Sequence, residues 1–291
     1  MDWMRHLAVC LAATLLTACT SAPSLPESGA AAQAAPIRSM LWVGNSFFYY
    51  NNSMHGHVGQ LLSAQSDNGK RNVRQVSATL SGSGLNWHDV ASYFKPGGVS
   101  SYSFVGDNEV RFNTFSKPFD AVMLMDCSQC PIHPQLQAVF HAHAQKHSQT
   151  ARQHGAEPIF FMSWAYSDKP ELGEAGGTQY IQAGKANQAL VVPAGLAFAE
   201  SRARRADVPL IMPDKRHPTL QGTYLSACTV LASVFKVNPV GNKYTAGLPA
   251  DVVAHLQAVA WDTAQKFHAQ HGAGRQIRAL QSPWSGLRGC R

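Results

Sequence analysis

Residues 39–46 read SMLWVGNS, a short apolar run that ends in Gly44-Asn45-Ser46. A continuous apolar run of this length is typical of a strand buried on both faces, as in a parallel sheet covered by helices. Ligands of such sheets bind at the carboxyl ends of the strands. The stretch therefore predicts a parallel α/β domain, with Ser46 at the edge of the sheet where a binding site forms.

The rest of the chain alternates apolar runs with helical spacing. We expect further strands at 73–79, 121–125, 158–163 and 208–212. We expect helices at 53–66, from beyond 131 to about 154, and at 178–190, 195–206, 218–235 and 249–270. Strands that alternate with helices form parallel sheets with helices on both faces. The predicted fold class is α/β, a three-layer α/β/α sandwich with about five parallel strands, of which 208–212 is the last.

Polar segments follow the expected strands. They are Asn45-Ser46, 81–84, 126–131, Trp164 with Tyr166, and 214–217. Because the carboxyl ends of parallel strands share one edge of the sheet, we expect all five segments to converge there.

The chain begins with the features of an export signal. Arg5 precedes a short apolar run over residues 7–18, which is too short to span a bilayer. The run ends in Leu16-Thr17-Ala18-Cys19, which resembles the lipobox of bacterial lipoproteins. The resemblance implies cleavage after residue 18, lipid on Cys19 and, because Thr20 follows, an outer-membrane lipoprotein facing the periplasm or the cell surface. The alternative is an ordinary secretory signal with a chance cysteine.

Composition divides the remaining chain into three parts. Residues 19–37, rich in Ala, Ser and Pro, are expected to be a flexible tether, 38–272 the folded domain, and 273–291 a basic tail. The net charge is +7, without a basic stripe or a nucleic-acid-binding motif. We therefore expect no nucleic-acid partner, and membrane contact through the N-terminal lipid only.

The six cysteines fit an oxidising compartment. Cys10 leaves with the signal and Cys19 takes the lipid. The other four are Cys127, Cys130, Cys228 and Cys290, which allow three pairings that the sequence leaves open. Cys228 lies in an apolar helical pattern, which also suits a buried thiol.

Three segments resemble the SGNH (GDSL-like) serine hydrolases. They are Gly44-Asn45-Ser46, Ser81-Gly82-Ser83-Gly84-Leu85 and Asp214-Lys215-Arg216-His217-Pro218. The resemblance spans roughly residues 38–236 in the order of the family's motifs. It implies that Ser46 is the nucleophile, that His217 is its general base, and that Asp214 orients His217. It also implies that the N–H groups of Ser46 and Gly84 stabilise the oxyanion.

The chain departs from the family at the third oxyanion donor. Family members carry an Asn in a Gly-x-Asn-Asp block after the third strand, whereas residues 125–131 read MDCSQCP. Gln129 is our candidate for the missing amide, and Ser128 offers a hydroxyl instead. Asn45, Ser128, Trp164 and Tyr166 are our candidates for substrate contacts.

The expected activity is that of a serine esterase. Its substrates would be short acyl esters, especially O-acetyl groups on a polysaccharide or cell-wall glycan, cleaved through an acyl-serine without cofactor or metal. A glycan-binding lipoprotein without catalysis is one alternative, and a thiol-disulfide protein that uses Cys127 and Cys130 is another. His143 and His147 lie one helical turn apart, but no third ligand is near, so we expect a solvated helix face.

Overall fold

The computed structural model describes residues 36–65, 72–99 and 102–272. They belong to one compact unit, Ala34–Arg291, whose core side chains lie within the unit itself. The predicted signal peptide 1–18, nearly all of the tether and the tail 273–291 lie outside the described residues, as do Cys19 and Cys290. None of the helices in the described part is long and apolar enough to cross a bilayer.

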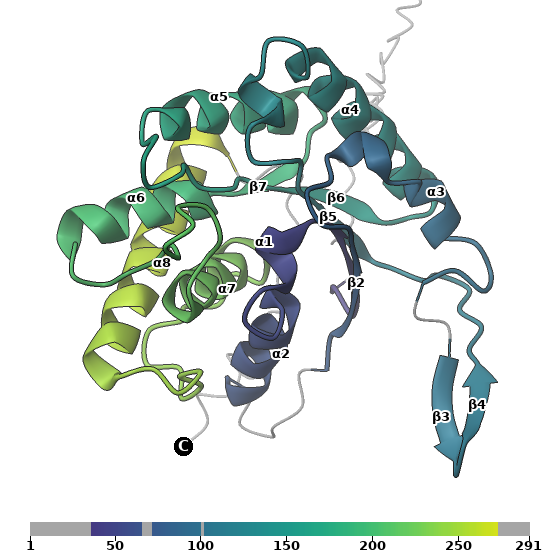
Figure 1. Ribbon diagram of the computed structural model, residues 1–291. Helices are drawn as coiled ribbons and strands as arrows, with labels where there is room; N and C mark the ends of the chain where they lie inside the picture. The colour runs from purple at the N-terminus through teal and green to yellow at the C-terminus, as the bar shows by residue number, and fades with distance from the viewer. Residues whose placement is uncertain (1–35, 66–71, 100–101, 273–291) are drawn as a thin grey trace, which may run out of the picture. The chain divides into compact units, whose positions relative to one another are not determined.

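A five-stranded parallel sheet forms the middle of the unit (Figure 1). Its order is β2-β1-β5-β6-β7, and every neighbouring pair is parallel. The strands are β1 (Ser39–Gly44), β2 (Arg74–Thr79), β5 (Ala121–Leu124), β6 (Glu157–Phe161) and β7 (Leu190–Val192).

Strand β1 lies inside the sheet, and all six of its residues are buried. Successive side chains enter opposite cores: Met40 and Trp42 belong to one hydrophobic cluster, and Leu41 and Val43 to the other. Burial on both faces explains why the run is continuously apolar rather than alternating.

Helices cover both faces of the sheet. One layer contains α2 (Met54–Ala64), α6 (Ala194–Arg204), α7 (Leu220–Val234) and α8 (Ala250–His271). The other contains α3 (Val90–Tyr93), α4 (Gln137–Gln153) and α5 (Leu172–Ala186). Figure 1 shows α4 and α5 on one side of the sheet and α2 and α7 on the other. The predicted three-layer α/β/α fold is confirmed.

The identity of the fifth strand was predicted wrongly. Residues 208–212 are not a sheet strand; only Ile211 forms a bridge, with Pro218. The fifth strand is β7, whose three residues follow α5 so closely that the sequence pattern merges them with the helix. Helix α5 begins at Leu172, six residues before the predicted start at 178. The prediction started late because Gly173, Gly176 and Gly177 lower the helix propensity of this segment.

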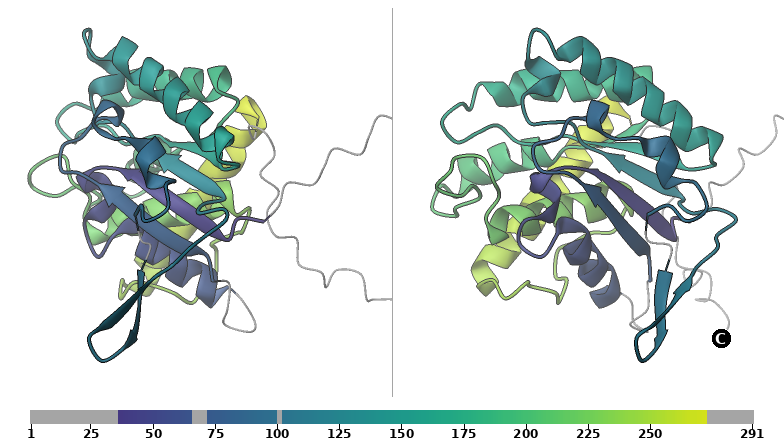
Figure 2. Two further views of the ribbon diagram at one scale, coloured as in Figure 1. Left: turned by 90° about the vertical axis from the view of Figure 1, so that its right-hand side faces the viewer. Right: turned by 45° about the vertical axis from the view of Figure 1, so that its right-hand side comes forward.

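Several short elements were not predicted. Ser46–Tyr49 forms α1, and the one-turn 3₁₀ helices η1 (Leu85–Trp87) and η2 (Cys130–Ile132) follow β2 and β5. Strands β3 (Tyr102–Gly106) and β4 (Glu109–Phe112) form an antiparallel hairpin that is separate from the main sheet. Figure 2 shows this hairpin projecting from the body of the unit in both views.

Helix α7 approaches the 208–212 segment closely. A Cβ on Gly222 would collide with the carbonyl oxygen of Leu210 and lie 3.0 Å from Cζ of Phe198. Thr219, the N-cap of α7, also donates its N–H to Leu210 and its hydroxyl to the Pro209 carbonyl. Gly222 therefore permits the contact that holds the start of α7 against this segment.

We expect Gly222→Ala to lower the free energy of unfolding by about 2 kcal/mol or more, because the added methyl group has no space. Gly56→Ala in α2 is the matched control. A Cβ there meets nothing within 4 Å, so its helix propensity should raise stability by roughly 0.5–1 kcal/mol. Urea denaturation of both variants measures the difference, and equal stabilities would contradict the close approach.

Candidate active site

Ser46 lies where β1 ends and α1 begins. Its residue is 6% exposed, and the preceding Asn45 caps the helix by accepting a hydrogen bond from the Phe47 N–H at 3.2 Å. As the first residue of α1, Ser46 has a backbone N–H that the helix itself cannot satisfy. The nucleophile candidate is thus fixed by a strand on one side and a capped helix on the other.

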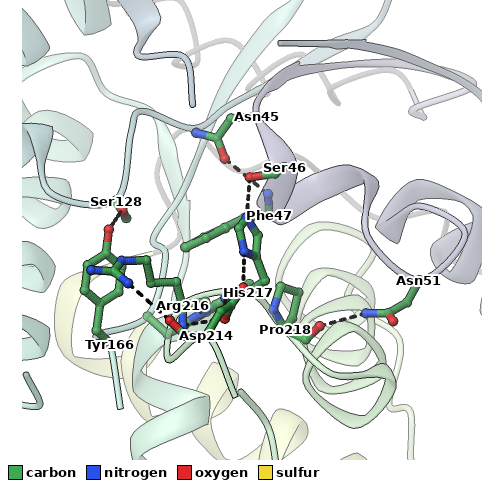
Figure 3. A network of polar contacts seen from close by, with 11 residues as sticks. Asn45, Ser46, Phe47, Asn51, Ser128, Tyr166, Asp214, Arg216, His217 and Pro218 are labelled. Atoms are coloured by element: carbon green, nitrogen blue, oxygen red, sulfur yellow. Dashed lines mark hydrogen bonds and ion pairs between the residues drawn. The ribbon is translucent and has the colours of Figure 1, made fainter. Parts of the chain in front are cut away.

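Asp214, His217 and Ser46 form one chain of hydrogen bonds (Figure 3). Nδ1 of His217 is 2.6 Å from Oδ2 of Asp214, and its Nε2 is 2.8 Å from Oγ of Ser46. The structure thus brings together the three residues that the sequence motifs single out. This arrangement holds an imidazole in the tautomer that can accept a hydroxyl proton.

A tight loop presents Asp214 and His217 on the same side. The Met212 N–H donates to the His217 carbonyl at 2.8 Å, and Lys215 adopts a left-handed φ of 67° at the turn. Oδ1 of Asp214 accepts the N–H groups of Arg216 and His217 at 2.9 and 3.0 Å. One carboxylate therefore shapes the loop with one oxygen and orients the imidazole with the other.

The environment keeps Asp214 ionised. Partial burial acts to raise its pKa, but the hydrogen bonds from Arg216 and His217 outweigh this effect and place the pKa below its usual value. The carboxylate side chain is 42% exposed and that of His217 is 24% exposed, so this side of the site is open to solvent.

Aromatic rings fix the position of the His217 imidazole. Tyr50 stacks on it with ring centroids 4.2 Å apart, and Phe47 meets it edge-on at 5.6 Å. Asn51 holds the next residue, because its amide donates to the Pro218 carbonyl at 2.9 Å. The aromatic run after Ser46 thus positions the general-base candidate, a role that the sequence alone did not reveal.

Trp164, a predicted substrate contact, lies inside the structure. It is 2% exposed and stacks between Phe47 and Phe198, with centroid distances of 4.7 and 4.2 Å. Its indole N–H donates to the Arg216 carbonyl at 2.9 Å. Trp164 therefore supports the loop that carries Asp214 and His217.

Tyr166 and Ser128 lie together beside the site (Figure 3). Their hydroxyl groups form a hydrogen bond, and the Arg216 guanidinium carbon lies 4.8 Å from the centroid of the Tyr166 ring. Gln129 lines a small pocket with Trp164, Tyr166 and Tyr180. These side chains link the loop after β5 to the loop after β6.

The loop that carries Gly84 is held from several directions. The Asn45 amide donates to the carbonyls of Ser83 and Asp126, at 2.9 and 3.2 Å. Both amide hydrogens of Asn45 are thus engaged within the fold, which gives this predicted substrate contact a positioning role. The Ser83 hydroxyl donates to the Gly44 carbonyl at 2.9 Å and lies 3.0 Å from Nε2 of His88.

Asp126 supports the same loop from the interior of the protein. It is 3% exposed, and its Oδ1 accepts the N–H groups of Leu85 and Cys127 at 2.9 and 2.7 Å. Burial raises its pKa to about 6, although the two N–H groups oppose the shift. A Cβ on Gly84 would lie 2.6 Å from this oxygen, so the contact requires glycine.

His147 also supports the loop and does not lie on the solvated helix face that we expected. It is 1% exposed, and its Nε2 lies 2.9 Å from the Leu85 carbonyl. Burial lowers its pKa to about 4. The neutral ring therefore donates this hydrogen bond at neutral pH.

Cys127 and Cys130 form a disulfide in the loop after β5. Cys228 is a fully buried thiol in α7. Asp126, Cys127 and Cys130 present the ligand atoms that lie close enough together for a metal ion. Because the disulfide removes both thiolates, this group lacks the donors that a transition metal requires.

Asn86 was missed by the sequence reasoning. Its exposed side-chain amide lies next to Gly84: Oδ1 is 2.8 Å from the position of a Gly84 Cβ. The sequence signal that could have identified Asn86 is the spacing Gly84-x-Asn86, which resembles the family's Gly-x-Asn. It follows β2, whereas the family's Asn was sought after the third strand.

Asp126→Asn should remove a pH dependence of stability. The pKa of Asp126 rises from 3.8 to about 6 in the folded state, so between these values the folded protein holds a proton that the unfolded chain has lost. The free energy of unfolding therefore falls as pH rises through this window, by up to about 3 kcal/mol. The Asn variant still accepts the two N–H bonds but does not titrate. Its stability relative to wild type should increase from about pH 4 to pH 7 in urea denaturation, and a constant difference would contradict this role.

No protein-family profile matches the chain, and no curated protein matches it significantly. A solved DUF4886 family protein from Bacteroides uniformis is 15% identical with a TM-score of 0.53, and the match covers 78% of this chain and 94% of that one.

Two further structures show lower structural scores. A protein proposed to be an SGNH hydrolase, from Slackia heliotrinireducens, is 19% identical with a TM-score of 0.46, covering 65% of this chain and 94% of that one. A catalytic mutant of an acetylxylan esterase from Geobacillus stearothermophilus is 14% identical with a TM-score of 0.49, covering 68% and 94%. The chain shares its fold, a three-layer α/β/α architecture, with the Bacteroides uniformis protein.

Proposed function

We propose that the protein is a serine esterase that cleaves carboxylic esters through an acyl-serine. The observation that carries the proposal is the continuous hydrogen-bond chain from Asp214 through His217 to Ser46, at 2.6 and 2.8 Å. A site that only binds a ligand has no need for an aligned carboxylate, imidazole and hydroxyl.

The geometry supports a two-step reaction. As Oγ of Ser46 attacks the ester carbonyl, its proton passes to Nε2 of His217, and Asp214 stabilises the imidazolium through Nδ1. His217 then protonates the leaving alcohol. In the second step, water attacks the acyl-serine, His217 takes the proton from water, and Oγ of Ser46 recovers it.

The oxyanion that forms in both steps needs preorganised donors. The Ser46 N–H lies at the start of α1, and the Gly84 N–H precedes η1. Neither group donates to a backbone acceptor in the turns and loops of the described part of the chain. Both are therefore available to a substrate oxygen.

For the third donor we propose the amide of Asn86 ahead of that of Gln129. Asn86 lies beside Gly84, whereas Gln129 lines the pocket formed with Trp164 and Tyr166. Because Asn86 Oδ1 lies beside Gly84, a rotation of the exposed Asn86 amide would turn its Nδ2 donor toward an oxygen bound by the Gly84 N–H.

We propose short acyl groups as substrates, especially O-acetyl on a polysaccharide or cell-wall glycan. The preference for a small acyl group rests on the resemblance of the sequence motifs to the SGNH hydrolases. The His217 and Asp214 side is open, which suits a large alcohol. The proposed export and lipidation at Cys19 would place the domain where such glycans occur.

Ser46→Ala should lower the hydrolysis of p-nitrophenyl acetate by at least about 1,000-fold, because no other group forms the acyl intermediate. A fluorophosphonate should label the wild-type chain once and fail to label this variant, as read by mass spectrometry. Ser63→Ala in α2 is the matched control and should behave as wild type. Equal hydrolysis by both variants, or label on another residue, would remove Ser46 from the chemistry and favour the glycan-binding alternative.

Asn86→Ala should lower kcat by about 100-fold with little change in KM, as expected for the loss of one oxyanion donor. Gln129→Ala, measured on the same ester, should change kcat much less. The reverse ranking of the two variants would restore Gln129 as the third donor.

A further inference from the structure

The β3–β4 hairpin has one apolar face. Its register pairs Tyr102 with Phe112 and Phe104 with Val110. Because side chains of directly paired residues and of every second residue share a face, these four project from the same side of the ribbon. Their exposed fractions are 54, 74, 77 and 47% in the order named. Half or more of this aromatic surface faces solvent.

Apart from Val105 at the register shift, the opposite face of the hairpin is polar. Ser103 pairs with Arg111, and the Asn113 amide donates to the Ser103 hydroxyl at 2.6 Å. The two acids, Asp107 and Glu109, lie at the turn, with Glu109 paired to Gly106. A two-stranded ribbon with one such face gains stability when that face is covered.

The hairpin lies at the rim of the sheet opposite the candidate active site. Its second strand leads to β5 through Asp120, whose carboxylate accepts the N–H groups of Arg38 and Ser39 at the start of β1. Ser46 and Gly84, by contrast, follow the carboxyl ends of β1 and β2. Figure 1 shows the hairpin beyond the sheet, away from the α1 helix that carries Ser46.

The chain enters the folded unit at the same rim. Residues 20–35 separate Cys19 from the first described residue, Pro36. A segment of this length can span at most about 50–60 Å. A lipid on Cys19 would therefore hold the domain within that distance of the bilayer, by the rim that also carries the hairpin.

The charges around the apolar face suit anionic head groups. Arg38 and Lys95 are exposed at this end of the unit, and Lys95 lines the same pocket as Phe112; Arg111 lies on the polar face of the hairpin. The acids of the hairpin lie at its tip, which opposes insertion tip-first and favours contact along the flat face. Tyr and Phe side chains partition well into the interfacial region of a membrane.

We propose that the β3–β4 hairpin is a membrane-contact element that lays its apolar face on an anionic phospholipid bilayer. The contact adds to the expected lipid anchor and turns the rim that carries Ser46 away from the bilayer. It is independent of the proposed hydrolysis.

Co-sedimentation with vesicles tests the proposal directly. The chain from residue 20 onward, without lipid on Cys19, contains the entire compact unit and is mixed with vesicles of phosphatidylethanolamine and phosphatidylglycerol. Phe104→Ser with Phe112→Ser should lower the partition coefficient by at least about tenfold, because two exposed rings lose their lipid contact. Phe104→Trp with Phe112→Trp should retain binding, and brominated lipids should quench the added tryptophan fluorescence.

Val240→Ser is the control, because Val240 is an exposed apolar residue that lies outside the hairpin, with 51% of its surface exposed. It should bind vesicles as wild type does. Failure of the wild-type chain to bind, or equal binding by the double-serine variant, overturns the proposal. So does a dimer that the double-serine variant abolishes, or binding of glycan in place of vesicles. Hydrolysis of a soluble ester by the same preparations reports separately on the proposed function.

Discussion

The arrangement of the site depends on the side chain of one buried residue, Asn45. Its carbonyl oxygen caps α1, and its two amide hydrogens bind the carbonyls of Ser83 and Asp126. Three strand ends, those of β1, β2 and β5, are thereby joined at one point. A buried amide with every partner in place is favourable, whereas each partner lost would leave a costly unpaired group. The nucleophile, the Gly84 loop and the disulfide loop therefore keep a common geometry.

The general-base candidate is held by a different kind of interaction. The loop that carries Asp214 and His217 is connected to the main sheet by no strand in the described part of the chain. Stacking of Tyr50 on His217 and the indole bond from Trp164 to Arg216 take the place of strand pairing. Aromatic contacts of this kind are broad and tolerant of small shifts, while the two short hydrogen bonds of the triad set the final alignment. A polar network thus fixes one half of the site, and mainly aromatic packing fixes the other.

Much of the fold and the triad could be predicted from the sequence, because they leave strong local signals. The run before Ser46 is apolar throughout, since β1 is buried on both faces. The supporting residues leave no such signal. Asp126, His147 and Asn86 become neighbours of the Gly84 loop only after β2, β5 and α4 have packed together. Strand β7 was missed for a related reason: with three residues, it is defined by its pairing with β6 rather than by its own pattern.

The bond between His217 and Ser46 joins residues that are 171 positions apart in the chain. When the ribosome has translated β1 and Ser46, Asp214 and His217 are still to be translated. Contacts of such long sequence separation form late in folding, because the chain between them must first be ordered. The nascent chain therefore remains without an aligned triad during synthesis. The hydrogen bond from His217 to Ser46 would form only when the whole domain has folded.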